Sequence, residues 1–559
     1  MKTSSILLGF VVATSICLPS CKTTHPFVDY ANQHSVDQAS TKDQDFVSSL
    51  ESGAKPYLDA HGRVTPELQS ALYEVEHRYY DHLDAQAQTR FQAFLASIGG
   101  KLISPQKMPE SSVPFWLVEK GPLDGYRSHT SVPKHADIVI IGAGLTGASA
   151  AYHLAEEAKK GRTVLVIEAE KGPARVSSGR NGGNFQLLPE NYVGSYEGMV
   201  EERIKVLRIK RPELSPKARA ELAEKEAKIL VNFSAQNFQR FRDLVSREGI
   251  DCDFSEQGWL RIASSAKEEE ALIKDTHWLN ALNDSRLPKN ELWTAKTIQE
   301  KLGIPAKFSG RYIAKNGNYH PFKYVTAVLE NAIGKGVQFY TNLPVQKVEQ
   351  TGKFIRVKTP EGDILTHKVI VATNSQTPRL FPELDRRIIT YPSQIINMEH
   401  VEDSLQGMTV TEQGGDIYYN MPKSKQYVGL DGKKRGMLHF GEDLPIVKEG
   451  ESQSVSRDEN HFARMKTLID ERFPTTKAQP ASRVWVGPMA FTNDRVPVIG
   501  FLRSKNIVIA AAFQGYGGSY CTEAGYVAAQ MALTGKVHQE VPKELFSPER
   551  FLTKQELVD

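Results

Sequence analysis

The sequence predicts an α/β (α+β) protein whose central part is a Rossmann-like dinucleotide-binding domain. Residues 137–141 (DIVII) form an apolar run typical of a buried parallel strand. The motif GAGLTG follows at residues 142–147, and a helical stretch continues to residue 154. A second strand over residues 163–167 ends at Glu168. A strand, a glycine motif, a helix, a second strand and a terminal acid, in this order, indicate a dinucleotide site.

Each position of this motif has a physical reason. Gly142 permits the tight turn, Gly144 lets the backbone approach a pyrophosphate, and Gly147 allows close packing of helix on strand. The phosphates then lie at a helix N-terminus, where unpaired N–H groups favour anions. Glu168 is placed to accept hydrogen bonds from an adenosine ribose. The alternative is a doubly wound fold that uses these glycines only to turn.

Composition limits the other possibilities. The 559 residues suffice for more than one domain, and 69 basic against 66 acidic residues give no indication of nucleic-acid binding. The four cysteines lack the spacing of a metal site, so no metal is expected. Cys252 and Cys521 are expected to be buried and free of a disulfide.

The N-terminus is typical of a targeting segment. An apolar run over residues 6–18 is too short for a permanent bilayer span but suits a signal peptide. It ends in LPSC, which resembles a bacterial lipobox with Cys21 as the lipidated residue, although Pro19 departs from the usual pattern. Residues 1–21 therefore predict an exported, membrane-anchored periplasmic lipoprotein, with a cytoplasmic protein as the alternative. Residues 22–113 are expected to form a tether and a small helical accessory region of unassigned role.

The middle of the chain alternates helix and strand signals. A helix is expected from Ser215-Pro216 to about residue 248, and its buried stripe is expected to contain Leu222, Ile229, Phe233, Phe241 and Leu244. Strands are expected at residues 258–263, 337–340, 342–345 and 368–374, and His320-Pro321 opens another helix. Residues 391–441 are strand-rich and would complete an antiparallel sheet over the site.

Two further glycine-rich loops carry anion-binding signals. The first is SSGRNGGN at residues 177–184, in which Arg180 could compensate an anionic cofactor. The second, QGYGGS at residues 514–519, follows a strand over residues 507–511 and opens a helix over residues 520–533. Glycine loops at both ends of one chain make a dinucleotide site more specific than either loop alone.

Taken together, the segment 138–154, Glu168 and the SGRNGG loop resemble the D-amino-acid oxidase/glycine oxidase family of FAD enzymes. Within it the chain is most similar to the gamma-glutamylputrescine oxidase branch, which carries the Arg-Asn-Gly-Gly loop. The resemblance covers residues 114–535 and leaves 536–559 as a C-terminal tail. It implies FAD-binding segments at about 135–195, 320–385 and 480–535, and a substrate domain at about 196–319 and 386–479.

The resemblance also implies the cofactor and its contacts. FAD is expected to be noncovalent, because residues 487–500 contain neither cysteine nor histidine. The residues expected to contact it are Gly142, Ala143, Gly144, Leu145, Thr146, Gly147, Glu168, Ala169, Ser178, Gly179, Arg180, Asn181, Gly182, Gly183, Val345, Ala372, Thr373, Gly515, Tyr516, Gly517 and Gly518.

The implied reaction is oxidation of the C–N bond of a small-molecule amine by hydride transfer to flavin N5, with oxygen or a respiratory-chain component as acceptor. No general base is assigned; the pocket candidates are His320, Tyr418, Tyr419, Tyr516 and Met489. The alternatives are an amino-acid oxidase or dehydrogenase of the same family, a catalytically inactive flavin-binding lipoprotein, and a nicotinamide-dependent reductase. The last would need a second glycine fingerprint, which the sequence lacks.

Two positions point to the substrate class. In the family's amino-acid oxidases, arginines pair with the substrate carboxylate, and those positions fall on Met489 and Tyr516 here. An unpaired carboxylate buried there would cost several kcal/mol, on the order of 3–5. We therefore expect an amine without an adjacent carboxylate, unless Arg495 supplies the charge from a shifted position.

The lipobox interpretation can be tested directly. Cys21→Ser should move the protein from the membrane fraction to a soluble or unprocessed form, as measured by fractionation and N-terminal sequencing. Identical distribution of variant and parent, both with an intact N-terminus, would support the cytoplasmic alternative.

Overall fold

A computed structural model gives the fold of the chain, which divides into two compact units, residues 1–106 and 107–559. In the first unit, helix α2 (Asp43–Ala54) buries Val47, Leu50 and Ala54. The predicted lipidation site, Cys21, and most of the predicted accessory region lie outside the described residues. The structure describes residues 27, 43–57, 87, 89–91, 93–94, 108–109, 111–118, 120–187, 195–282, 284–412, 417–428, 433–443, 456–477 and 480–552.

The second unit contains a predominantly parallel sheet that we call the dinucleotide sheet. Its strands follow the order β18-β19-β11-β1-β2-β8, and β10 and β9 extend it as a branch from β11. The strands from β19 to β8 are parallel to their neighbours, as expected for strands buried on both faces. Their bounds are β1 (His135–Ile141), β2 (Val164–Ile167), β8 (Gln338–Tyr340), β9 (Lys347–Thr351), β10 (Phe354–Thr359), β11 (Gly362–Val371), β18 (Val498–Leu502) and β19 (Ser504–Ala511).

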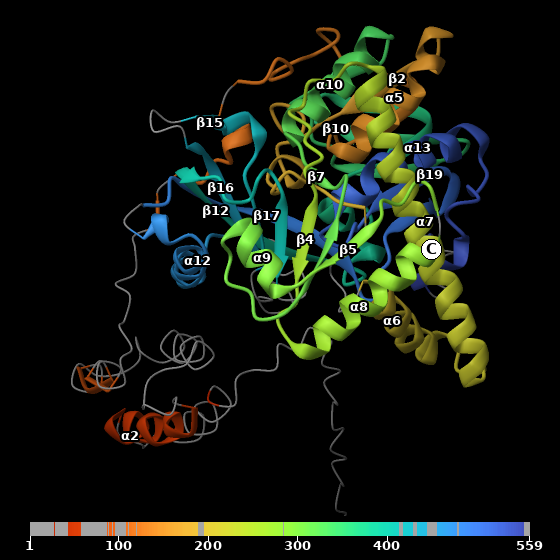
Figure 1. Ribbon diagram of the computed structural model, residues 1–559. Helices are drawn as coiled ribbons and strands as arrows, with labels where there is room; N and C mark the ends of the chain where they lie inside the picture. The colour runs from red at the N-terminus through yellow and green to blue at the C-terminus, as the bar shows by residue number, and fades with distance from the viewer. Residues whose placement is uncertain are drawn as a thin grey trace, which may run out of the picture. The chain divides into compact units, whose positions relative to one another are not determined.

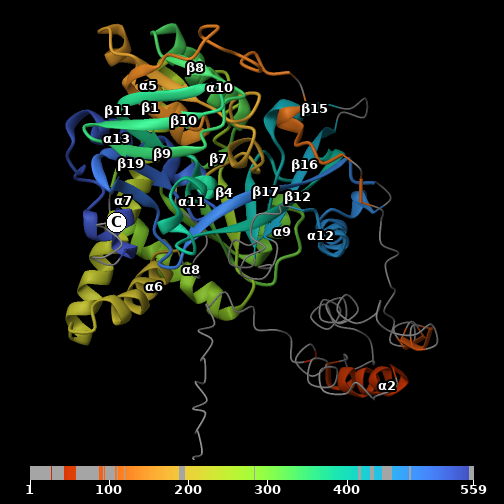
Figure 2. The same ribbon diagram turned by 180° about the vertical axis from the view of Figure 1, so that it is seen from behind.

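Helices α5 (Leu145–Lys159), α10 (Pro321–Gly334) and α13 (Gly517–Thr534) cover one face of this sheet, in front of it in Figure 1 and behind it in Figure 2. Ile138 and Ile140 of β1 face these helices, whereas Val139 and Ile141 face the core on the other side. Because β1 ends at Ile141 and α5 begins at Leu145, the C-terminal end of the strand lies directly before the N-terminus of the helix. This is the topology that the sequence predicts.

A second sheet, which we call the substrate sheet, runs in the order β17-β12-β16-β14-β13-β4-β6-β5, with β15 on β16. Its pairings are antiparallel as predicted, except that β13 and β4 run parallel. The bounds are β4 (Trp259–Ile262), β5 (Asn290–Trp293), β6 (Gly310–Ile313), β12 (Ile388–Glu402), β13 (Thr409–Glu412), β14 (Ile417–Asn420), β15 (Tyr427–Val428), β16 (Lys434–Asp443) and β17 (Arg483–Thr492). A short ribbon of β3 (Asn184–Phe185) and β7 (Gly317–Asn318) completes the strands.

The two faces of the substrate sheet have different partners. Ile396, Leu438 and Phe440 face a core that includes Phe462 and Met465 of helix α12 (Glu459–Arg472). Residues that alternate with these along β12 and β16, and residues of β17, point to the opposite face of the sheet. They include Ile395, Met437 and Trp485, which pack in the core that contains α5 and α13. The second face therefore looks toward the dinucleotide domain.

The remaining helices support this arrangement. The long helix begins where predicted, because the Ser215 side chain accepts a hydrogen bond from the N–H of Ala218, and Pro216 occupies the first turn. Phe233, Phe241 and Leu244 of the predicted stripe are buried. Leu222 and Ile229 are only half-buried, because Ala223, Ala227 and Leu230 occupy the buried face in the first part of the helix. These helices are α6 (Ser195–Lys210), α7 (Pro216–Arg247), α8 (Ala266–Ala281), α9 (Ala295–Leu302), α11 (Thr377–Leu380) and α14 (Lys543–Phe546).

One predicted strand is wrong. Residues 342–345 form no strand, because Asn342 adopts φ +52° and turns the chain, and Pro344 lacks an N–H for a ladder. Other predictions are confirmed: Cys252 and Cys521 are free and buried. Among the helices that the structure describes, none combines the length and apolar composition needed to cross a bilayer.

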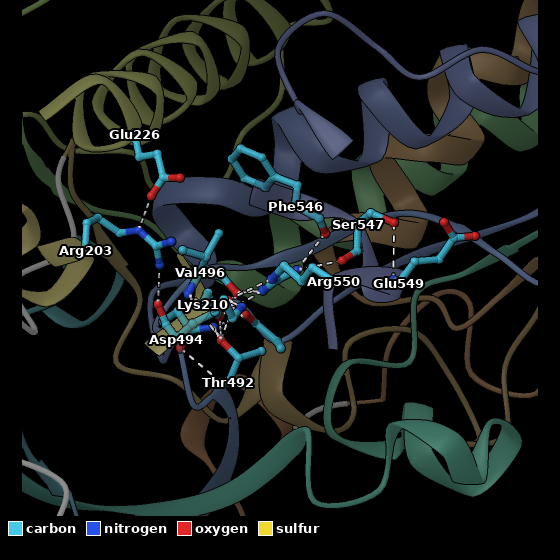
Figure 3. A network of polar contacts seen from close by, with 12 residues as sticks. Arg203, Lys210, Glu226, Thr492, Asp494, Val496, Phe546, Ser547, Glu549 and Arg550 are labelled. Atoms are coloured by element: carbon cyan, nitrogen blue, oxygen red, sulfur yellow. Dashed lines mark hydrogen bonds and ion pairs between the residues drawn. The ribbon is translucent and has the colours of Figure 1, made fainter. Parts of the chain in front are cut away.

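The chain crosses between the two sheets at residues 493–497, and a buried ion network fixes this crossing (Figure 3). Asp494, 3% exposed, accepts hydrogen bonds from Arg550 Nε and Lys210 Nζ, both at 2.9 Å. Arg203 of α6 donates to the Asp494 carbonyl (3.0 Å) and pairs with Glu226 of α7 (2.6 Å). The network thus joins the crossing to α6, to α7 and to the C-terminal turn at Pro548–Phe551.

This network predicts the effect of removing its carboxylate. Burial alone would raise the pKa of Asp494, but Arg550, Lys210 and Arg203 outweigh it and lower the pKa. The carboxylate therefore stays ionised above about pH 4, and its stabilising contribution is lost only as pH falls below the unfolded value. Asp494→Asn leaves the buried Arg550 guanidinium without its carboxylate partner and should lower the free energy of unfolding by about 3–5 kcal/mol.

Denaturant unfolding at pH 5 and pH 8 measures this loss, which should be equal at the two values. Glu549→Gln is the matched control, because Glu549 pairs with the exposed Lys543 and should cost less than about 1 kcal/mol. A similar small loss for Asp494→Asn would contradict a structural role for the network.

Candidate functional site

The site begins at the C-terminal end of β1, where the backbone turns too tightly for any side chain. Gly142 has φ +100°, and a Cβ atom there would lie 2.8 Å from the carbonyl oxygen of Ala372. A Cβ atom at Gly147 would lie 1.9 Å from the carbonyl oxygen of Gly142. The first and third glycines therefore bring α5 against β1 and the end of β11.

The second glycine faces the SGRNGG loop. A Cβ atom at Gly144 would lie 2.7 Å from the hydroxyl oxygen of Ser178, and the Leu145 N–H donates to that hydroxyl at 3.0 Å. Gly144 is the N-cap of α5 and offers no side-chain cap, so most N–H groups of the first turn are available to a ligand. The loop and the helix N-terminus, which are separate in sequence, thus form one surface.

The second glycine-rich loop brings another helix N-terminus to the same place. Helix α13 starts at Gly517 without a side-chain cap, and a Cβ atom at Gly517 would lie 3.9 Å from Leu145 Cδ1. Two uncapped helix N-termini side by side favour a polyanion. Gly518 lies against the Asn184 carbonyl, at 2.7 Å from a Cβ position, so this loop also contacts the SGRNGG loop.

Glu168 lies at the end of β2, where the sequence places it. Its Oε2 accepts a hydrogen bond from the Ala143 N–H at 2.7 Å, and its Oε1 accepts one from the Glu170 N–H at 2.9 Å. Burial raises the pKa of Glu168, and these backbone donors oppose the rise. The Leu343 N–H donates to the Glu168 carbonyl at 2.9 Å, which brings the segment containing Val345 beside it.

The SGRNGG loop is held by two indole rings. Trp116 Nε1 donates to the Asn181 carbonyl and Trp485 Nε1 donates to the Arg180 carbonyl, each at 2.9 Å. The Arg180 guanidinium donates to the Val486 carbonyl at 3.2 Å, and within the described residues no carboxylate forms an ion pair with it. Burial lowers the pKa of Arg180, and Glu170 offsets only part of this. The site thus contains a half-buried cation that an anionic ligand would compensate.

The structure brings three of the pocket candidates to this region. A Cβ atom at Gly182 or Gly441 would lie 2.3 Å or 2.2 Å from the Tyr418 ring, so this ring lies between the glycine loop and the substrate sheet. Met489 contacts Gly515, with its Sδ 3.1 Å from a Cβ position there. Tyr516 is the N-cap residue of α13.

Two other candidates have different roles. His320 is the N-cap of α10: its Nδ1 accepts a hydrogen bond from the Lys323 N–H at 3.3 Å. Its ring lies 4.8 Å from that of Trp116, and burial lowers its pKa to about 4. Tyr419 is not a pocket residue. It is fully buried on the α12 side of the substrate sheet, and its hydroxyl donates to Glu412 at 2.5 Å, because neighbouring strand residues point to opposite faces.

Sequence reasoning missed other residues of the site. Trp116 anchors the loop, Asn420 Nδ2 donates to the Gly182 carbonyl at 2.9 Å, and His439 lies 4.9 Å from Trp116 between ring centroids. One signal could have found His439, since it is a polar residue in the apolar strand MLHFG.

These features fit a dinucleotide. The glycine turns leave room for backbone approach, the two helix N-termini and Arg180 suit phosphates, and the Glu168 carboxylate suits a ribose hydroxyl. The residues expected to contact FAD come from segments far apart in sequence. In the structure, they meet at one edge of the dinucleotide sheet.

Comparisons with known proteins agree with this geometry. A family model described as FAD dependent oxidoreductase matches residues 137–531. The chain is 24% identical over 410 residues to the probable oxidoreductase OrdL of Haemophilus influenzae, covering 72% of this chain and 83% of that protein. It is also 24% identical over 400 residues to the gamma-glutamylputrescine oxidoreductase of Escherichia coli, covering 71% and 83%. A solved structure of L-amino acid deaminase from Proteus vulgaris shares the fold, with TM-score 0.56, 20% identity and coverage of 77% and 98%.

The position of Glu168 predicts its contribution to cofactor retention. Glu168→Ala removes a charged acceptor worth about 1.5–3 kcal/mol, which corresponds to roughly 10- to 150-fold weaker FAD binding. Glu170→Ala is the matched control, because it removes an exposed carboxylate two residues away and keeps the backbone N–H that Glu168 accepts. Equilibrium dialysis against FAD measures both, and unchanged affinity in Glu168→Ala would show that the acid does not contact the cofactor.

Proposed function

Because the chain belongs to the FAD dependent oxidoreductase family, we propose that it oxidises the C–N bond of an amine that lacks an adjacent carboxylate. The protein is an FAD-dependent enzyme, and its relatives support action on amines or amino acids. The narrower substrate class rests on one observation, which is the apolar character of the wall around Met489.

This wall is formed by neighbouring residues of β12 and β17. Tyr391 and Met489 are paired in register, and the Tyr391 and Phe491 rings lie 5.0 Å apart. Met489 and Phe491 both contact Gly515, which lies in the QGYGGS loop just before α13. Met489 offers no positive charge to a substrate carboxylate that lies against it. The alkyl stem of an amine, in contrast, would bury apolar surface there.

The chain's own residues supply binding and orientation. FAD, when bound, supplies the hydride acceptor for the oxidation of the C–N bond. The glycine loops and Arg180 would hold it, and Tyr418 packs on Gly182 and Gly441 where it can limit access of water. The aromatic wall would hold the substrate stem, so that alignment and desolvation of the amine account for much of the rate.

Amino-acid oxidation is the second candidate, and Arg495 is the observation that favours it. Its guanidinium carbon lies 5.7 Å from the centre of the Phe491 ring. Burial raises the pKa of Tyr391, and the charge of Arg495 opposes that rise, so this cation lies near the wall. A substrate carboxylate could therefore pair with Arg495 if the substrate extended past Phe491.

The location and the electron acceptor belong to the same proposal. The LPSC segment supports export and lipid anchoring at Cys21, with oxygen or a respiratory-chain component as the acceptor. An anchored enzyme would lie next to membrane-bound acceptors.

The substrate class can be tested by anaerobic flavin reduction. We expect putrescine and its N-acyl derivatives to reduce the flavin faster than glycine, D-alanine or sarcosine. Met489→Arg should shift the ratio of the two rates toward the amino acids by about tenfold or more, since a carboxylate would gain a charged hydrogen-bond partner. Met489→Leu is the control and should keep the parent's preference. Faster reduction of the parent by the amino acids, abolished in Arg495→Gln, would establish the second candidate instead.

A further inference from the structure

The four successive backbone carbonyl groups of residues 180–183, in the SGRNGG loop, are all bonded to the protein. Each accepts a hydrogen bond from a different segment of the chain. The donors are Trp485 Nε1 to Arg180 (2.9 Å), Trp116 Nε1 to Asn181 (2.9 Å), Asn420 Nδ2 to Gly182 (2.9 Å) and the Tyr319 N–H to Gly183 (2.8 Å). These donors belong to β17, to the turn at Phe115–Leu117, to β14 and to the residue that follows β7. The loop is therefore held by its carbonyl side.

This arrangement fixes where the N–H groups of the loop point. In a trans peptide group the carbonyl and the N–H point in opposite directions, and no peptide bond among the described residues is cis. The Asn181 N–H therefore points away from Trp485, and the Gly182 N–H points away from Trp116. The Gly183 N–H donates to Asn181 Oδ1 at 2.8 Å, but the other two have no hydrogen-bond partner within the part of the chain that the structure describes. Two adjacent backbone donors are thus left for a ligand.

The chemistry of these donors restricts the ligand. Gly182 is buried, so an unpaired N–H there is costly unless an acceptor completes it. Two backbone N–H groups in succession form a concavity that favours negative charge. The half-buried Arg180 guanidinium lies on the same loop, and it donates to the Val486 carbonyl at 3.2 Å rather than to a carboxylate. The loop therefore suits an acceptor that carries negative charge.

The position of the loop indicates which part of FAD it would contact. The first turns of α5 and α13 already offer N–H groups to the phosphates. Residues 180–182 lie against the substrate sheet instead, since Gly182 packs on Tyr418 of β14 and Gly487 of β17 packs on the Arg180 backbone. A cofactor that extends from the phosphates toward the substrate has its isoalloxazine ring in this place. The oxygens and nitrogens of the pyrimidine part of that ring are hydrogen-bond acceptors, and they become more negative on reduction.

We propose that Trp116 and Trp485 are positioning residues that turn the N–H groups of Asn181 and Gly182 toward the pyrimidine part of the flavin. Because that part gains negative charge on reduction, fixed donors there favour the reduced form and raise the reduction potential of the bound cofactor. This role rests on FAD binding and not on the substrate class proposed above. Trp116 also lies outside residues 137–531, so the family match does not assign it.

Three single variants of the full chain test the proposal. Trp116→Phe and Trp485→Phe each remove one indole donor and keep an aromatic ring in the core. Trp259→Phe is the matched control, because Trp259 is 1% exposed and its Nε1 donates to the Thr411 hydroxyl at 3.1 Å and not to the loop. The measurements are the Tm and the dissociation constants of the apoprotein for oxidised FAD, for FAD kept reduced by dithionite without oxygen, and for ADP.

The ratio of the two FAD dissociation constants gives the shift in reduction potential through a thermodynamic cycle. Each loop variant should weaken the binding of reduced FAD about tenfold or more beyond its effect on oxidised FAD, which is a fall of about 30 mV for a two-electron couple. The reason is that a carbonyl without its donor lets the peptide group rotate, so that its N–H loses a charge-assisted hydrogen bond. ADP has no flavin, so its affinity should stay at the parent's value. Trp259→Phe should lower the Tm and leave the ratio unchanged.

Three results would overturn the proposal. If the ratio in both loop variants equals the parent's, the indoles only stabilise the loop. If ADP binding weakens as much as FAD binding, the two N–H groups serve the phosphates instead. If Trp259→Phe changes the ratio by the same amount, the shift reflects a loosened core. The two tryptophans belong to separate elements, so a variant that does not fold leaves the other to decide. No amine substrate is needed, so failure of the proposed function is detected separately.

Discussion

The arrangement of the site depends on close approach of backbone to backbone at a few glycines. Gly147 lets α5 lie against the carbonyl of Gly142, and Gly525 lets α13 lie against Ser149 of α5, where a Cβ atom would come within 2.5 Å of the serine Cβ. These contacts align two helices so that both N-termini reach the same edge of the dinucleotide sheet. The positive end of one helix dipole is a weak anion site, but two adjacent ones with uncapped N–H groups form a strong one.

Much of this could be predicted from the sequence because the signals are local. The glycine motif, the Ser215-Pro216 helix start and the terminal Glu168 each depend on residues within one turn or one strand, where sterics and capping decide the conformation. The fold class follows from their order, and the family match confirms it. The failed strand at residues 342–345 also has a local cause, because Asn342 tolerates the left-handed region that ends a strand.

The place of Tyr418, Asn420 and His439 in the site depends on register between strands far apart in the chain. Tyr418 and Tyr419 are adjacent and chemically identical, yet only Tyr418 faces the SGRNGG loop. The pairing of β14 with β16 decides which of the two tyrosines faces it. His439 and Asn397 become neighbours only through the pairing of β12 with β16. A single sequence shows which residues of a strand alternate between its two faces, but it does not show how that strand aligns with its neighbours. The face of the sheet that lines the site could therefore not be derived from the sequence.

The crossing at residues 493–497 has a consequence for motion. One continuous chain leaves the substrate sheet as β17 and enters the dinucleotide sheet as β18, and Asp494 between them is fixed by Arg550 and Lys210. A hinge rotation at this crossing would strain the buried pair of Asp494 with Arg550, which is costly to break in a low-dielectric interior. The crossing therefore resists rotation of one sheet relative to the other. We expect small molecules to enter and leave through rearrangement of loops and single side chains rather than through hinge motion at this point.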